Sequence, residues 1–174
     1  MDYKRQLEFD KAYLSCAVAV SKLSRAKKKQ VGCIIVDPDT GIVAEGFNGT
    51  PPGLDNNCEF YCPHEDIDAN GPSLRCRRCS ASWDPLQHKT PDSLLTLPEV
   101  IHAEANGIMK AARSAKSTDG AILYCTLEPC FNCSKLIIGA GIHRVVYLEK
   151  YSSLNGSGLS LLEKASIQVH QVLL

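Results

Sequence analysis

The sequence predicts a three-layer α/β/α sandwich built on a mixed five-stranded sheet. Segments with apolar residues at helical spacing alternate with short apolar runs typical of buried strands along most of the chain. In addition, 44% of the 174 residues are hydrophobic, which suffices for one compact domain with a core. We therefore expect residues 1–174 to form a single domain.

The chain begins with a predicted helix and a strand hairpin. Residues 9–23 place apolar side chains at helical spacing. Residues 31–36, VGCIIV, are typical of a buried strand, and residues 42–48 are typical of its partner. The turn DPDTG between them joins the two strands.

Beyond residue 98, helices and strands alternate again. The predicted elements are a helix at 102–115, a strand at 121–126, a helix that has Pro129 in its first turn and ends at Gly139 or Gly141, a strand at 143–149, a helix at 159–165 and a strand at 167–173. This order predicts helices packed on a sheet that contains both parallel and antiparallel strands.

Charge and composition exclude several classes of function. Lys and Arg together number 19, as do Asp and Glu, so the chain lacks the basic excess of a protein that binds long nucleic acid. The N-terminal residues contain no apolar segment of a signal peptide, and no apolar run is long enough to span a membrane. We therefore expect a cytoplasmic protein without a membrane partner, in a compartment where thiols stay reduced.

Nine cysteines are many for such a chain, and an odd number favours metal binding over a disulfide framework. Four of them lie between residues 49 and 98, a segment with poor periodicity and most of the prolines. Their spacing, C-x3-C-x13-C-x2-C, is close to that of a zinc ribbon, which would order an insert at about 54–98. The predicted ligands of this structural zinc ion are Cys58, Cys62, Cys76 and Cys79. His64 could replace one of them, and four unrelated cysteines are the alternative.

Two short motifs carry the predicted chemistry. His102 and Glu104 open one predicted helix as His-x-Glu, and Pro-Cys-x-x-Cys opens the next helix with Cys130 and Cys133. Alone, the first motif is typical of a solvated helix start, and the second also fits a redox dithiol, half of a structural zinc site or two buried thiols. In a β-α-β-α arrangement, however, both helix starts meet at one edge of the sheet.

One imidazole and two thiolates leave a fourth tetrahedral position open, which is the pattern of catalytic zinc. Zinc lowers the pKa of bound water to about 7. We expect Glu104 to take a proton from this water, to deliver it to a ring nitrogen and to help ammonia leave. H-x-E with P-C-x-x-C is the signature of zinc-dependent nucleobase deaminases.

With these motifs, the sequence resembles the cytidine and deoxycytidylate deaminase superfamily over residues 9–174, and this resemblance implies a cytidine deaminase-like fold. GFNGTPPG, residues 46–53, is similar to the G-[YF]-N-G-x-P-x-G motif of deoxycytidylate deaminases. The resemblance places Asn48 and Thr50 at the nucleotide, although the stretch is also an ordinary turn. It implies hydrolysis of dCMP to dUMP and ammonia, which supplies dUMP for thymidylate synthesis.

The resemblance also implies further substrate contacts. Lys28 lies in the basic segment SRAKKKQ, which borders the nucleotide site in that family, and is a candidate for the phosphate. Tyr151 matches a tyrosine that lines the pocket. A solvated loop and a surface tyrosine are the simpler readings of these two residues.

Other family properties are expectations. The family often has a second, structural zinc ion, forms hexamers, and is activated by dCTP and inhibited by dTTP. Cys58 stands where one structural ligand is expected, whereas Val100 occupies a position at which some relatives have another. The alternatives are a deaminase of a free nucleoside or tRNA, and a zinc-stapled binding module without activity.

Overall fold

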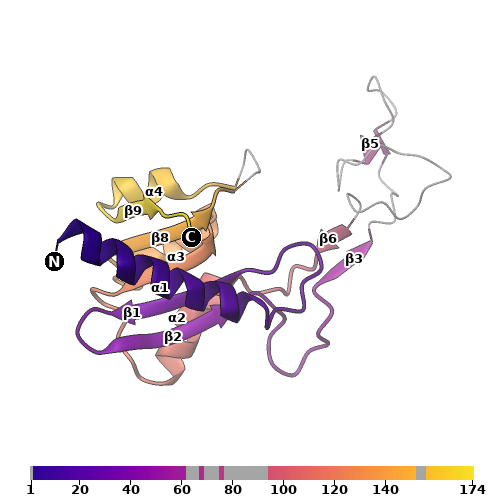
Figure 1. Ribbon diagram of the computed structural model, residues 1–174. Helices are drawn as coiled ribbons and strands as arrows, with labels where there is room; N and C mark the ends of the chain where they lie inside the picture. Colours follow the sequence, from indigo (N-terminus) through magenta and orange to yellow (C-terminus); the bar gives the residue numbers. More distant parts are fainter. Residues whose placement is uncertain (1, 62–66, 69–74, 77–93, 152–155) are drawn as a thin grey trace.

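The computed structural model describes residues 2–61, 67–68, 75–76, 94–151 and 156–174. Its main body is a five-stranded sheet in the order β2-β1-β7-β8-β9, with helices on both faces (Figure 1). β1 is antiparallel to β2 and β7, whereas β7, β8 and β9 run parallel. The predicted α/β/α sandwich with a mixed five-stranded sheet is confirmed.

The predicted helices and strands are present, mostly within two residues of the expected bounds. The elements of the main body are α1 (Tyr3–Ser21), β1 (Gly32–Asp37), β2 (Gly41–Phe47), α2 (Ala103–Arg113), β7 (Ile122–Leu127), α3 (Phe131–Gly139), β8 (Arg144–Glu149), α4 (Leu159–Lys164) and β9 (Gln168–Gln171). None of the helices in the described part of the chain has the length and apolar character that a membrane span requires.

Two helix starts differ from the prediction. The first helix begins six residues early, because the side chain of Asp2 caps it by accepting a hydrogen bond from the Arg5 backbone N–H at 2.9 Å. Pro129, expected in the first turn of α3, lies before the N-cap residue Cys130. The cysteine pair therefore stands at the very start of the helix.

Apolar side chains cover both faces of the sheet. Helix α1 packs on one face through Leu14 and Ala17, against a cluster that includes Ile34, Tyr124 and Val146. The other face packs against α2, α3 and α4 in a larger cluster, which contains Cys33, Ile35, Ala103, Ala111, Leu123, Cys125, Ile137, Val145 and Leu162. Cys33 and Cys125 are thus buried core thiols.

One edge of the sheet gathers several chain ends. Because β1 is antiparallel to β7, the start of β1 lies beside the carboxyl end of β7, where the backbone N–H of Gly32 donates to Thr126 Oγ1 at 3.1 Å. The carboxyl ends of β2 and β8 lie at the same edge. Ligands of open α/β sheets bind outside such carboxyl ends.

The predicted insert leaves and rejoins the sheet at this edge. Gly49 and Ile101 pair through two backbone hydrogen bonds of 3.1 and 2.9 Å. Beyond them, β3 (Glu59–Tyr61) pairs with β6 (Leu94–Thr96), and both project away from the main body (Figure 1). A further pair joins β4 (Ile67–Asp68) and β5 (Arg75–Cys76). The strands described in this segment, β3 to β6, form two separate pairs and add no strand to the main sheet.

Candidate metal centre and active site

The two sequence motifs meet at the edge of the sheet. His102 and Cys130 are the N-cap residues of α2 and α3, and both have extended backbone. Neither side chain caps its own helix, so both are free to point toward each other. His102 Nδ1 lies 3.5 Å from Cys130 Sγ and 3.4 Å from Cys133 Sγ.

This geometry fits a zinc ion. In a tetrahedral site with Zn–N bonds of about 2.0 Å and Zn–S bonds of about 2.3 Å, the nitrogen and sulfur ligands lie about 3.5 Å apart. The ligand atoms of His102, Cys130 and Cys133 all lie within 4.8 Å of one another. Three soft or borderline ligands leave one position open, as in catalytic zinc sites.

The two thiols of the site differ in acidity. A hydrogen bond from the Cys133 thiol, opposed by burial and aided by His102, lowers the pKa of Cys130 to about 3. The same bond, together with burial, raises the pKa of Cys133. A bound cation would favour the second thiolate as well, since metal ligation requires deprotonated cysteines.

Glu104 lies beside the three ligands on the first turn of α2. Only 4% of the residue is exposed, and burial raises the pKa of its carboxyl group, opposed in part by the His102 charge. Its carboxyl group also lies close enough to interact with the Cys133 side chain. A buried carboxyl group of raised pKa is suited to general acid–base chemistry near neutral pH.

A cavity of about 510 Å³ opens at this site, a size that suits a small-molecule ligand. His102, Glu104 and Cys130 are among the residues that line it. Asn48, Lys28 and Tyr151, three of the four predicted substrate contacts, line it as well. They come from three different connections of the fold, so the edge of the sheet brings them together.

Asn48 has a structural role in addition to its place in the cavity. Its side-chain oxygen accepts from the Val31 backbone N–H at 2.8 Å, and its amide donates to the Lys29 carbonyl at 2.9 Å. It therefore fastens the loop before β1, and each amide atom keeps hydrogen-bonding capacity for a ligand. Thr50 does not line the cavity; its hydroxyl is buried without a hydrogen-bond partner among the described residues.

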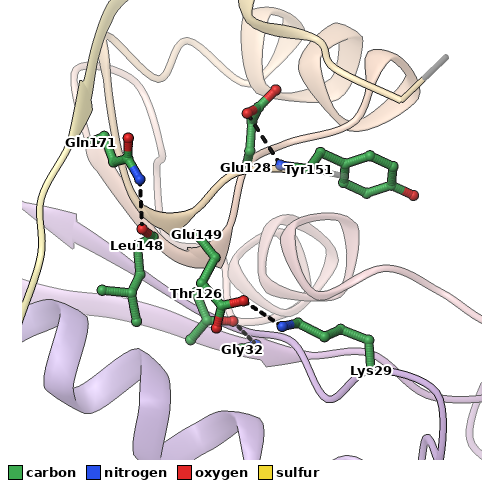
Figure 2. Close-up of polar contacts among 8 residues, drawn as sticks. All are labelled: Lys29, Gly32, Thr126, Glu128, Leu148, Glu149, Tyr151 and Gln171. Carbon is green, nitrogen blue, oxygen red and sulfur yellow. Dashed lines mark hydrogen bonds and ion pairs between the residues drawn. The ribbon is translucent and has the colours of Figure 1, made fainter. Parts of the chain in front are cut away.

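Glutamate side chains that line the cavity hold the backbones of Lys28 and Tyr151. The backbone N–H of Lys28 donates to Glu59 Oε1 at 3.2 Å. The backbone N–H of Tyr151 donates to Glu128 Oε2 at 3.3 Å (Figure 2). Burial, and then the charges of Cys130 and Glu104, raise the pKa of Tyr151, so its hydroxyl is a proton donor at neutral pH.

Sequence reasoning missed several charged residues of the cavity wall, namely Lys29, Glu59, Glu128, Glu149 and Lys150. Glu128 stood in the quoted stretch TLEPC, and Lys29 in the basic segment, but no spacing rule marks either as a contact. Glu59 comes from the insert, 32 residues from Lys27, whose backbone N–H it accepts at 3.0 Å. Only the folded chain reveals such contacts.

The predicted structural zinc site falls largely outside the described residues. Cys62, Cys79 and His64 lie in undescribed ranges, and Cys76 is placed only as part of the short strand β5. Cys58 is 2% exposed, and burial followed by the charge of Glu59 raises its pKa. The ligand set stays a prediction.

Comparison with known proteins supplies the family. Residues 7–149 match the model of the cytidine and deoxycytidylate deaminase zinc-binding region. The deoxycytidylate deaminase of Schizosaccharomyces pombe is 34% identical over 94% of this chain, and that of Enterobacteria phage T4 is 32% identical over 91%. The chain spans 44% of the yeast relative's length and 87% of the phage relative's.

A solved structure extends the comparison to the whole fold. The dCMP deaminase from the cyanophage S-TIM5, crystallised with dCMP and dUMP, is 31% identical, with a TM-score of 0.71 over 99% of each chain. The chain therefore belongs to the cytidine and deoxycytidylate deaminase family. The predicted family is confirmed, as is the predicted zinc cofactor, because the matched region is a zinc-binding one and the three ligands converge.

Proposed function

We propose that the protein hydrolyses dCMP to dUMP and ammonia, with a zinc ion held by His102, Cys130 and Cys133. One observation carries the proposal: the three ligand atoms converge within 4.8 Å, and the buried Glu104 lies beside them and lines the same cavity. A site that only bound zinc for structure would need neither an open position nor a buried acid.

The residues divide the reaction between them. Zinc held by these three residues would lower the pKa of a bound water and so supply the nucleophile near neutral pH. Glu104 takes the proton of this water and delivers it to the ring nitrogen next to the carbon under attack. It then takes the proton of the new hydroxyl group on the ring carbon and carries it to the amino group, which leaves as ammonia while the ring carbon becomes a carbonyl. Because Glu104 is buried, the protons that it carries between the attacking water and the cytosine ring are not lost to bulk solvent.

The relatives favour dCMP as the substrate, since the S-TIM5 enzyme was crystallised with dCMP and dUMP and the phage T4 relative carries the same activity in its name. Asn48 faces the same cavity as Glu104 and has spare donor and acceptor capacity for a sugar. Lys28 supplies a cation for the phosphate, and Tyr151 lines the pocket.

Family membership supports four further proposals. The first is a structural zinc ion in the insert, with Cys58 as one ligand. The second is a homo-oligomer, a hexamer as in the resembling family. The third is activation by dCTP and inhibition by dTTP. The fourth is a cytoplasmic location.

The test is ammonia release by zinc-loaded protein from dCMP, deoxycytidine, cytidine and a tRNA anticodon stem. We expect rapid release from dCMP and slow release from the other three. Faster release from cytidine or from the tRNA stem would contradict the proposal and point to another nucleobase substrate. The same assay with dCTP or dTTP added tests regulation.

A further inference from the structure

An ion pair joins two residues that line the cavity. Lys29 Nζ, on the loop before β1, lies 2.5 Å from Glu149 Oε2 at the end of β8. β7 lies between β1 and β8, so the pair crosses over its carboxyl end (Figure 2). Both residues line the cavity that contains Glu104, and neither was part of the predicted site.

This pair holds its lysine weakly. The two side chains are 47% and 54% exposed, and ion pairs in water stabilise a protein by about 0–1 kcal/mol. By contrast, the buried Arg144 and Asp10 share two hydrogen bonds of 2.7 and 2.8 Å. Lys29 can therefore leave Glu149 for a stronger anion at little cost in free energy.

The two residues of the ion pair differ in how freely they can move. Glu149 is paired in the sheet with Leu127, and its carbonyl accepts from the Glu128 backbone N–H at 2.8 Å. Lys29 lies on a loop and has a flexible four-carbon stem. When a competing anion enters, the lysine moves and the glutamate stays.

The other carboxyl groups of the wall have different tasks. Glu59 accepts backbone N–H groups of the loop that carries Lys28, Glu128 accepts that of Tyr151, and Glu104 lies at the metal centre. Glu149 is the one whose ion pair with a cavity lysine is seen in the described structure. A phosphate monoester carries a charge of about −1.5 to −2 at pH 7, more than one carboxylate.

We propose that Lys29 determines specificity for nucleotides over nucleosides by exchanging Glu149 for the 5′-phosphate of the bound substrate. Glu149 is then the counterion of Lys29 in the absence of substrate, which keeps Lys29 at the cavity wall and competes with the phosphate. This inference rests on the proposed function, since it adds a contact, beside Lys28, to the phosphate of the same substrate.

The proposal predicts opposite effects for the two partners. Lys29→Met should raise the KM for dCMP about tenfold and leave the kinetics with deoxycytidine nearly unchanged. Glu149→Gln should lower the KM for dCMP about twofold to fivefold, because a competing anion is gone. If the pair served only as a strut between β1 and β8, both variants would impair both substrates in the same direction, and that result would overturn the proposal.

Lys110→Met is the matched control. Lys110 pairs with Glu45 at 3.0 Å, with similar exposure of 35% and 49%, and neither residue lines the cavity. Its loss should leave the ratio of kcat/KM between dCMP and deoxycytidine unchanged.

Binding of dUMP and of inorganic phosphate, measured by calorimetry on the same zinc-loaded variants, separates the two proposals. Weaker binding to Lys29→Met and tighter binding to Glu149→Gln would support the phosphate contact, even in a protein that failed to turn over dCMP and so contradicted the proposed reaction. Normal turnover of dCMP with phosphate binding unaltered by Lys29→Met would overturn the role of Lys29 and leave the reaction in place.

Discussion

At the scale of single residues, Glu104 differs from every other carboxyl group of the cavity wall in its position. It lies on the turn that follows His102 and beside Cys133, so it reaches the metal centre without ligating it. Its burial costs free energy, because a carboxyl group taken out of water disfavours its charged form. The proposed role of Glu104 as the proton carrier accounts for an acid at this buried position.

Replacement of Glu104 by glutamine tests this role. The amide keeps the shape but can neither accept nor deliver the proton, so we expect kcat to fall about 10²-fold to 10⁴-fold. Zinc content should stay the same, because no ligand is lost. Turnover close to that of the unaltered protein, at equal zinc content, would contradict the role of Glu104.

The residues of the site were predictable to different degrees. His102, Glu104, Cys130 and Cys133 carry a signature in their spacing, because helix geometry and metal ligation both constrain it. Glu128 and Lys29 have no such constraint; their places in the cavity wall depend on how distant segments pack. Asn48 was predicted as a ligand contact, but its bonds to the loop before β1 were not visible in the sequence.

At the scale of elements, two glycines set the distance between α2 and the sheet. A Cβ atom on Gly46 would lie 2.1 Å from the Ala103 carbonyl oxygen and 2.5 Å from the Gly107 nitrogen. Both contacts are with backbone, which cannot turn aside as a side chain can. The position of His102 and Glu104 beside the cavity thus depends on Gly46 of β2, which has no side chain.

Gly46→Ala should therefore separate α2 from β2. We expect a loss of about 1–3 kcal/mol in the free energy of unfolding, measured by urea denaturation, together with reduced activity. Gly139→Ala is the control, because nothing lies within 4 Å of its added Cβ and alanine favours a helix. Equal stability of the two variants would refute the close-approach argument.

Helix α1 is fastened to the opposite face by a buried ion pair. Arg144 on β8 donates two hydrogen bonds to Asp10, and Tyr124 donates a third at 3.0 Å. Burial disfavours the Asp10 carboxylate, but the hydrogen bonds from Arg144 and Gln6 and the charge of Arg144 outweigh it. The pKa of Asp10 therefore lies below the usual 3.8.

The sign of the pH dependence follows from this lowered pKa. Ionised Asp10 stabilises the fold fully above about pH 4, and the contribution is lost as the pH falls below 3.8 through the folded-state pKa. Asp10→Asn leaves Arg144 buried without its counterion, so we expect a loss of about 3 kcal/mol at pH 7.

Urea unfolding of both proteins at pH 7 and pH 3 measures the effect, and the difference between them should shrink at the lower pH. A difference that is the same at both pH values would mean that the charge of Asp10 does not carry the stabilisation.

The elements themselves were largely predictable, because apolar periodicity marks the segments that bury a face. Their ends were less so: the start of α1 depends on the cap formed by Asp2, and that of α3 on Cys130 rather than on Pro129. The short strands β3 and β6 were not predicted. Three residues have no period that distinguishes a strand from a loop.

At the scale of the whole molecule, the insert joins the main body at the edge of the sheet where the cavity lies. The Gly49–Ile101 pairing closes the excursion directly beside Asn48 and His102, and Glu59 and Thr96 of the insert form part of the cavity wall. The order of the insert therefore affects the shape of the substrate site. A metal ion is a means to give order to a segment with little apolar core.

Counting metal tests whether zinc does so. We expect two zinc ions per chain in the unaltered protein and one in Cys58→Ser, with His102, Cys130 and Cys133 still occupied. Because the lost ion orders only the insert, the variant should unfold at lower temperature and show a raised KM for dCMP through the displaced wall, while keeping a measurable kcat. Cys16→Ser, at an exposed position on α1, should retain both ions. One zinc ion in the unaltered protein, or two in Cys58→Ser, would remove Cys58 from the proposed structural site and leave packing of β3 on β6 to hold the insert.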